Sequence, residues 1–186
     1  DRWLRQRKPG QVERIEGGIE ILLKVCDALA YAHHRGVIHR DLKPANIMVG
    51  DFGQVYLMDW GLAKLARSQP ASGEGALMNA PGPVGTPDFM SPEQARGNPR
   101  EVDERSDVFG LGALLYEVLC GHGPYGPVGT TSDVVQRAAA GDIVPIDQAC
   151  EHIGVSKRIR AIAERATQPD PAKRYQSVAE MQDAMR

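Results

Sequence analysis

The sequence predicts a mainly α-helical domain, in which a helical bundle surrounds a buried central helix and carries a small β-hairpin. Three observations lead to this fold class. Apolar residues recur at helical spacing before residue 36, two short β-rich runs follow them, and a later segment is apolar on nearly every face. With 186 residues the chain can bury one sizeable core, and its composition requires no second domain.

The first helix is predicted over residues 18–35. Its apolar residues fall on one helical face, and Gly36 suits the position after the last turn. They are Ile19, Leu22, Leu23, Cys26, Leu29 and Ala30. The residues before Gly18 form a charged lead-in that contains Pro and Gly. Residues 46–49 and 55–58 are β-rich, and the turn-forming residues between them predict a hairpin.

Residues 66–85 have no sustained period, and this predicts a long loop. A helix is expected to begin after Ser91, with Pro92 at its first position and Gln94 closing a capping box. The segment 106–119 should be the buried central helix, because its apolar residues lie on every face. Three more helices are predicted at residues 132–140, 156–167 and 177–186.

Composition excludes several classes of protein. A net charge of −2 gives no electrostatic attraction to nucleic acid or to an anionic membrane. No apolar run approaches the roughly 20 residues that cross a bilayer, so we expect no membrane segment in this chain. Cys26, Cys120 and Cys150 are far apart and lack metal-ligand spacing. We therefore expect reduced thiols and a cytoplasmic location.

The range 39–46 reads His-Arg-Asp-Leu-Lys-Pro-Ala-Asn and gathers an acid, a base and an amide in one tight loop. It resembles the catalytic loop of protein kinases. Phosphoryl transfer needs a group that orients the attacking hydroxyl and accepts its proton, positive charge near the phosphate, and cation ligands. The resemblance assigns these tasks to Asp41, Lys43 and Asn46.

A second motif, Asp59-Trp60-Gly61, follows the second β-rich run, thirteen residues beyond Asn46. It is similar to the family's Asp-Phe-Gly element, and this implies that Asp59 is a metal ligand. A literal Asp-Phe-Gly begins at Asp51, but it comes only five residues after Asn46. We interpret it as a hairpin turn and keep Asp51 as the less favoured alternative for the metal carboxylate.

The range 85–93 resembles the substrate-docking segment that ends the kinase activation segment, here residues 59–93, with Ser91 where the family usually has Ala. The serine/threonine branch implies that Thr86 bonds Asp41 and Lys43. Further family positions imply that Asp107 braces the backbone of the catalytic loop, and that Arg174 pairs with Glu93.

Three other assignments depend on the resemblance. Arg40 could pair with an activating phosphate, for which Ser68, Ser72 and Thr86 are candidates. Met48 fits a position under the adenine ring, although an ordinary core methionine is equally consistent with the sequence. Histidines outside any motif are assigned to the surface or to packing: His33, His34, His122 and His152.

The residues of these motifs are similar to those of eukaryotic-like serine/threonine protein kinases of bacteria. Such kinases are often anchored to a membrane by a segment outside the kinase domain. The resemblance implies the C-terminal catalytic lobe over residues 1–186, with ATP and Mg²⁺, or Mn²⁺ in its place, and protein substrates that offer Ser or Thr hydroxyls. No Gly-rich loop or strand lysine precedes His39. We therefore expect an N-terminal lobe in cis to complete the site, and no activity from this chain alone.

Two other functions stay open. A pseudokinase would only dock partners, but it would have no chemical need for Asp41, Lys43, Asn46 and Asp59 together. Small-molecule phosphotransferases share the Asp-x-x-x-x-Asn and Asp-x-Gly motifs, here at residues 41–46 and 59–61. The docking segment at residues 85–93 argues against it, because that segment presents a protein substrate.

Overall fold

The computed structural model describes residues 11–65, 82–127, 130–150 and 156–186. The longer helices are α2 (Gln11–His34), α4 (Glu104–Cys120), α5 (Thr131–Ala140), α7 (Lys157–Ala166) and α8 (Val178–Met185). Two single-turn helices are α3 (Pro92–Ala95) and α6 (Ile146–Ala149). The strands are β1 (Val37–Ile38), β2 (Ile47–Val49), β3 (Val55–Leu57) and β4 (Lys64–Leu65). Short 3₁₀ helices are η1 (Pro44–Asn46), η2 (Trp60–Leu62), η4 (Pro87–Phe89) and η5 (Pro171–Lys173).

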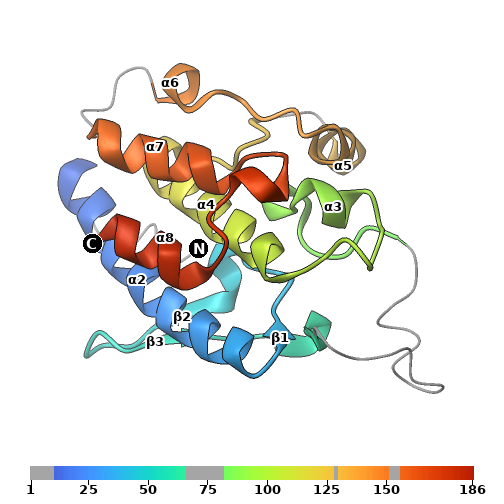
Figure 1. Cartoon of the computed structure of the whole chain (residues 1–186). Coiled ribbons are helices and arrows are strands. Elements are labelled where there is room, and N and C mark those ends of the chain that lie inside the picture. The colour runs from blue at the N-terminus through green and yellow to red at the C-terminus, as the bar shows by residue number, and fades with distance from the viewer. Residues whose placement is uncertain (1–10, 66–81, 128–129, 151–155) are drawn as a thin grey trace.

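Helix α4 is the centre of the fold (Figure 1). From Ser106 to Leu119 all of its residues except Glu117 are buried, as the all-round apolar pattern predicts. It packs against α2, α7 and α8, and most of the main core lies between these helices. The mainly α-helical bundle around a buried central helix is therefore confirmed.

Helix α2 begins seven residues earlier than the sequence indicates, at Gln11 instead of Gly18. Ile15 is only 8% exposed and extends the apolar stripe toward the N-terminus. The sequence analysis placed a charged lead-in before Gly18, whereas the helix continues through this residue, and Gly18 serves helix packing. A Cβ atom there would lie 2.6 Å from Cγ1 of Val118 on α4, so a larger residue would push the two helices apart.

The predicted hairpin is present as β2 and β3, which pair antiparallel with Met48 opposite Tyr56. Asp51, Phe52 and Gly53 form its turn, and Phe52 is 90% exposed. The interpretation of this Asp-Phe-Gly as a turn is confirmed. A second pair, β1 with β4, was not expected, because two-residue strands are too short to show alternation.

A smaller core supports the segment that ends with α3. It gathers Met90, Ala95, Phe109, Ala113, Tyr125, Val134 and Ala138. The Tyr125 hydroxyl donates to the carbonyl of Met90 over 2.6 Å, and burial raises the pKa of this phenol. The segment before α3 is thus fixed to the residues that follow α4.

Other expectations about the chain are met within one or two residues. The helices predicted at 132–140, 156–167 and 177–186 correspond to α5, α7 and α8. Most of the predicted loop 66–85, with Ser68 and Ser72, lies outside the described residues. Among the helices of the described ranges, none is both long and apolar enough to cross a membrane.

The expectation of three reduced cysteines is wrong. Cys120, at the end of α4, and Cys150, just after α6, form a disulfide across 30 residues of sequence, and Cys26 is a buried free thiol. Desolvation raises the pKa of Cys26 to about 12. Spacing alone could not reveal this pair, because the fold brings the end of α4 beside α6.

Reduction of this disulfide should lower the free energy of unfolding by about 2–4 kcal/mol, because the unfolded chain regains the freedom of a 30-residue loop. Urea unfolding with and without a dithiol reductant measures the change. In the double variant Cys120→Ser/Cys150→Ser the reductant should have no further effect. Three titratable thiols in the denatured, unreduced protein would contradict the assignment.

Candidate active site

The carboxylate of Asp107, buried near the start of α4, holds the backbone of the loop after β1. Its Oδ2 accepts the N–H of His39 at 2.8 Å, and its Oδ1 accepts the N–H of Arg40 at 2.9 Å. Buried carboxylates need such donors. The expected contact between Asp107 and the loop backbone is therefore present.

Arg40 has a left-handed backbone with φ of 70°. This conformation is costly for a residue other than glycine, and it turns the chain sharply just before Asp41. The guanidinium is buried and its Nε donates to the carbonyl of Leu62 in η2. Burial lowers the pKa of Arg40, and the nearby Asp107 charge opposes that change.

The carboxylate of Asp41 is the point on which the loop's polar side chains converge. Lys43 Nζ donates to Oδ2 at 2.7 Å, Thr86 Oγ1 donates to Oδ1 at 2.7 Å, and Asn46 Nδ2 lies 3.3 Å from Oδ2. Asn46 Nδ2 also donates to the Asp41 carbonyl at 2.8 Å. The expected contact of Thr86 with Asp41 is therefore present, from a residue 45 positions away.

These donors set the charge state of Asp41. Burial by itself would raise the pKa of this carboxyl. The hydrogen bonds from Lys43, Thr86 and Asn46, together with the Lys43 charge, outweigh burial and hold the pKa below its ordinary value. Asp41 is thus a carboxylate at neutral pH, able to accept a hydrogen bond and a proton from an approaching hydroxyl.

Local sequence explains this geometry. Pro44 begins the short helix η1, where a missing N–H costs nothing, and the turn brings Asn46 back toward Asp41. Asn46 then leads directly into β2. Because Asn46 uses its amide nitrogen for Asp41, its amide oxygen can serve as a ligand.

Asp59 lies near Asn46, on the next segment of chain. The N–H of Met58 donates to the Asn46 carbonyl at 2.8 Å, and Asp59 then adopts a left-handed backbone with φ of 59°. Its exposed side chain accepts the N–H of Gly61. Trp60 packs its ring against His39 with a centroid separation of 4.6 Å, which fills the place expected for Phe.

These oxygens fit a hard divalent cation. Carboxylate and amide oxygens are the ligands that Mg²⁺ prefers, and a cation that also binds phosphates needs only one or two protein ligands. Asp59 and Asn46 supply that number. In the described ranges no group of three or more His, Cys, Asp or Glu side chains is placed to hold a metal ion.

One functional contact was missed by the sequence analysis. His33, assigned to the surface or to packing, has its Nε2 2.7 Å from Oδ2 of Asp107. A signal for it was available. Leu22, Cys26, Leu29 and His33 follow one another at helical spacing, so a polar ring continues an apolar stripe and requires a buried partner.

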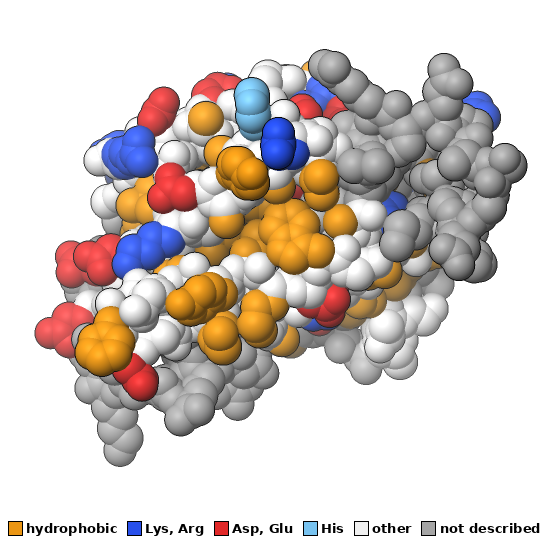
Figure 2. Space-filling view, turned by 90° about the horizontal axis from the view of Figure 1, so that it is seen from below, with side chains coloured by type: hydrophobic (Ala, Val, Ile, Leu, Met, Phe, Trp, Pro, Cys, Tyr) orange, Lys and Arg blue, Asp and Glu red, His pale blue; other side chains and the backbone are white. Residues whose placement is uncertain are grey.

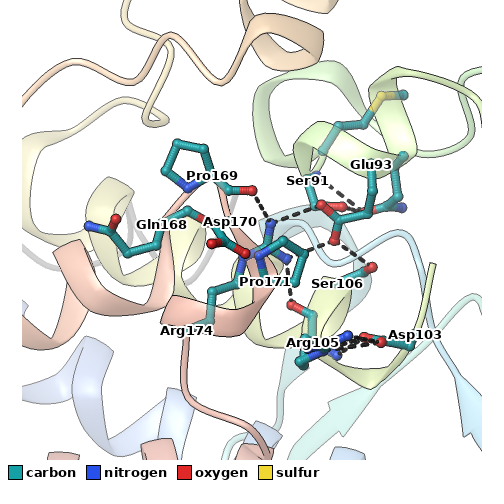
Figure 3. Close-up of polar contacts among 12 residues, drawn as sticks. Ser91, Glu93, Asp103, Arg105, Ser106, Gln168, Pro169, Asp170, Pro171 and Arg174 are labelled. Carbon is teal, nitrogen blue, oxygen red and sulfur yellow. Dashed lines mark hydrogen bonds and ion pairs between the residues drawn. The ribbon is translucent and has the colours of Figure 1, made fainter. Parts of the chain in front are cut away.

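Glu93 in α3 and Arg174 after η5 form a buried ion pair (Figure 3). Nη1 lies 2.7 Å from Oε1 and Nη2 lies 2.8 Å from Oε2, and Ser106 also donates to Oε1. The Arg174 side chain is 0% exposed. The expected pair is present, and it ties the docking segment to the C-terminal part of the chain and to α4.

Met48 belongs neither to the network around Asp41 nor to the Glu93–Arg174 pair. It is 48% exposed on β2, so the alternative of an ordinary core methionine is wrong. Apart from Asp59, described above, the other predicted residues divide into two groups. Arg40, Asp41, Lys43, Asn46, Thr86 and Asp107 are joined in one network around the loop, while Glu93 and Arg174 anchor the segment that carries Thr86.

The ion pair predicts a pH effect on stability. Burial alone would raise the pKa of Glu93, but the bonds and charge of Arg174 hold it below its ordinary value. The pair's contribution is then complete above the unfolded pKa of about 4.3 and is lost as pH falls through the lower folded value. Glu93→Gln should lower the free energy of unfolding at pH 7 by about 3–5 kcal/mol.

Urea unfolding between pH 7 and pH 3 tests this expectation. The difference between wild type and Glu93→Gln should shrink only below about pH 5. Asp147→Asn is the matched control, because Asp147 pairs with Arg160 at 2.7 Å but is 75% exposed. The control should change stability by less than about 1 kcal/mol. Equal effects of the two variants would contradict a special role for the buried pair.

Comparison with known proteins places this geometry in a family. Residues 3–185 match the protein kinase domain. The serine/threonine-protein kinase PknB of Mycobacterium tuberculosis is 40% identical over 163 residues, which are 88% of this chain and 25% of that protein. A probable PknB of Corynebacterium glutamicum is 35% identical, covering 87% of this chain and 24% of that protein. The serine/threonine-protein kinase PknD of Chlamydia felis is 34% identical, covering 89% and 18%.

The chain thus spans about a quarter or less of the length of these bacterial relatives. Within that span, the match covers both the loop around Asp41 and the segment that ends at Glu93. On this match, the chain belongs to the protein kinase family.

Proposed function

We propose that this chain is the catalytic lobe of a serine/threonine protein kinase, which transfers the γ-phosphoryl group of ATP to Ser or Thr hydroxyls of protein substrates. The observation that carries the proposal is the convergence of Lys43, Asn46 and Thr86 on the carboxylate of Asp41. This network keeps one ionised acceptor at a fixed point, as transfer to a hydroxyl requires.

In the proposed reaction Asp41 orients the acceptor hydroxyl and takes its proton. Lys43 places a positive charge beside Asp41, where charge on the transferred group can be neutralised. Asn46 and Asp59 would hold the divalent cation, Mg²⁺ or Mn²⁺, that accompanies ATP and neutralises its phosphates. Thr86 would keep the substrate-docking segment in register with Asp41.

An apolar surface beside the site could bind the adenine ring of the nucleotide. Seen from the side of the β2–β3 hairpin, hydrophobic side chains gather across the surface (Figure 2). The exposed large hydrophobic residues of the hairpin and the segment after it are Met48, Phe52, Tyr56, Met58 and Leu62. We propose that the adenine ring lies against Met48, and that an N-terminal lobe in cis covers the rest of this face.

Regulation is proposed at Arg40. Its guanidinium contacts η2, directly after Asp59, so a phosphate added to the activation segment, residues 59–93, could bind it and link that segment to the loop around Asp41. Mass spectrometry of the full-length protein after incubation with ATP tests this proposal. Phosphate between residues 62 and 86 supports it, and none there would contradict it.

ATP supply argues for the cytoplasm as the location of this lobe. A disulfide is uncommon there, so the pair Cys120–Cys150 provides a direct check. Alkylation of thiols in intact cells, before any reductant is added, is the measurement. Protection of both cysteines by the disulfide of the structure would contradict a cytoplasmic location, and alkylation of both would show that the bond does not form where the lobe resides.

Asp41→Asn in the full-length protein should reduce phosphorylation of a generic basic protein by about 10²–10⁴-fold, because the amide cannot accept the proton. The asparagine preserves shape and can still contact Thr86 and Lys43. Transfer of ³²P from ATP to Ser and Thr residues is the measurement. Undiminished transfer by the variant, or transfer by the wild type only to small molecules, would contradict the proposed class. Residues 1–186 alone should transfer no phosphate.

The two Asp-x-Gly carboxylates offer a matched comparison for the metal. Asp59→Asn should lower kcat by at least about 100-fold and raise the Mg²⁺ concentration needed for half-maximal rate. Asp51→Asn, in the exposed hairpin turn, should change neither quantity by more than about twofold. The reverse pattern would move the metal ligand to Asp51.

A further inference from the structure

The side chain of Gln94 lies between the loop around Asp41 and the segment that carries Thr86. It is 4% exposed, and its amide is fully used. Oε1 accepts the backbone N–H of Ser91 at 3.2 Å and the Ser91 hydroxyl at 3.0 Å. Nε2 donates to the carbonyl of Arg40 at 2.6 Å and to the carbonyl of Val84 at 3.0 Å.

Only the first pair of these bonds belongs to the expected capping box. A glutamate would close that box equally well, because the box needs only an acceptor for the N–H of Ser91. The second pair needs two N–H donors on the same side chain, and glutamine supplies both. The choice of Gln at position 94 is therefore explained by the contacts to Arg40 and Val84.

The carbonyl of Arg40 belongs to a strained stretch of backbone just before Asp41. Arg40 has the left-handed backbone described above, and its N–H is fixed by Asp107. Gln94 fixes its carbonyl, so both peptide groups of this strained residue are bonded to buried side chains. Strained backbone persists where its surroundings determine it in this way.

The segment on the other side of Gln94 runs close to the same carbonyl. Gly85 has φ of +121°, and a Cβ atom there would lie 2.8 Å from the Arg40 oxygen and 3.3 Å from Gln94 Nε2. Thr86 follows directly and donates to Asp41. Gln94 thus joins the two chain segments close to the Thr86–Asp41 contact, through Arg40, one residue before Asp41, and through Val84, two residues before Thr86.

We propose that Gln94 is a positioning residue, which holds residues 84–86 on the loop so that Thr86 stays bonded to Asp41 and the docking segment stays aligned with the acceptor site. This role rests on the proposed kinase function. It acts through backbone carbonyls, and Gln94 itself touches no reacting atom in it.

Gln94→Glu separates the two tasks, because it keeps the acceptor for Ser91 and places a carboxylate oxygen against two carbonyls. In the full-length protein, kcat/KM for a protein substrate should fall by about 10- to 100-fold. KM for ATP should stay within about twofold, because Asn46 and Asp59 make no contact with Gln94 in this network.

Gln182→Glu is the matched control. Gln182 in α8 is also a buried helical glutamine. Its Nε2 donates to the Leu23 carbonyl and to Asp27 in α2, and neither residue belongs to the network around Asp41. It should lose comparable stability while kcat/KM per folded molecule stays within about twofold.

Amide hydrogen exchange gives a readout that does not depend on activity. The N–H groups of Phe89 and Met90 donate to the carbonyls of Thr86 and Pro87, and they should exchange faster in Gln94→Glu than in Gln182→Glu. If the wild type transfers no phosphate, the proposed function fails and exchange alone decides the role of Gln94. Equal exchange in the two variants, or equal kcat/KM in an active protein, would overturn the role.

Discussion

The buried carboxylate of Asp107 is the constraint on which the site depends. It is held in α4, the most deeply buried helix, and it must be satisfied inside the molecule. Its partners are the backbone N–H groups of His39 and Arg40 and the ring of His33. The position of the loop is therefore set by the core, and Asp41 receives its orientation from the packing of α2 against α4.

Backbone strain is concentrated at the same place. In the described ranges, Arg40 and Asp59 are the residues other than glycine with positive φ. One precedes Asp41 and the other is the proposed metal ligand. Each costs about 1–3 kcal/mol in isolation. The hydrogen bonds of Asp107 and Gln94 on either side of Arg40 explain how that cost is tolerated.

Much of this arrangement could be predicted from local sequence, because motifs such as residues 39–46 have a fixed spacing and helices have a visible period. The contacts of Thr86, Asp107 and Arg174 followed from family resemblance. Contacts that depend on three-dimensional proximity alone could not be predicted. Cys120 and Cys150 have no distinctive spacing, and the capping box accounted for only half of the bonds of Gln94.

The disulfide also changes how the lobe would respond to mechanical force. Residues 121–149 carry Tyr125, which supports Met90, together with α5 and α6. Since their two ends are covalently joined, a pull on the chain termini cannot extend them. A fully stretched oxidised chain would be about 100 Å shorter than a reduced one. The polypeptide beside the docking segment would thus remain a closed ring of covalent bonds after every helix around it had been pulled apart.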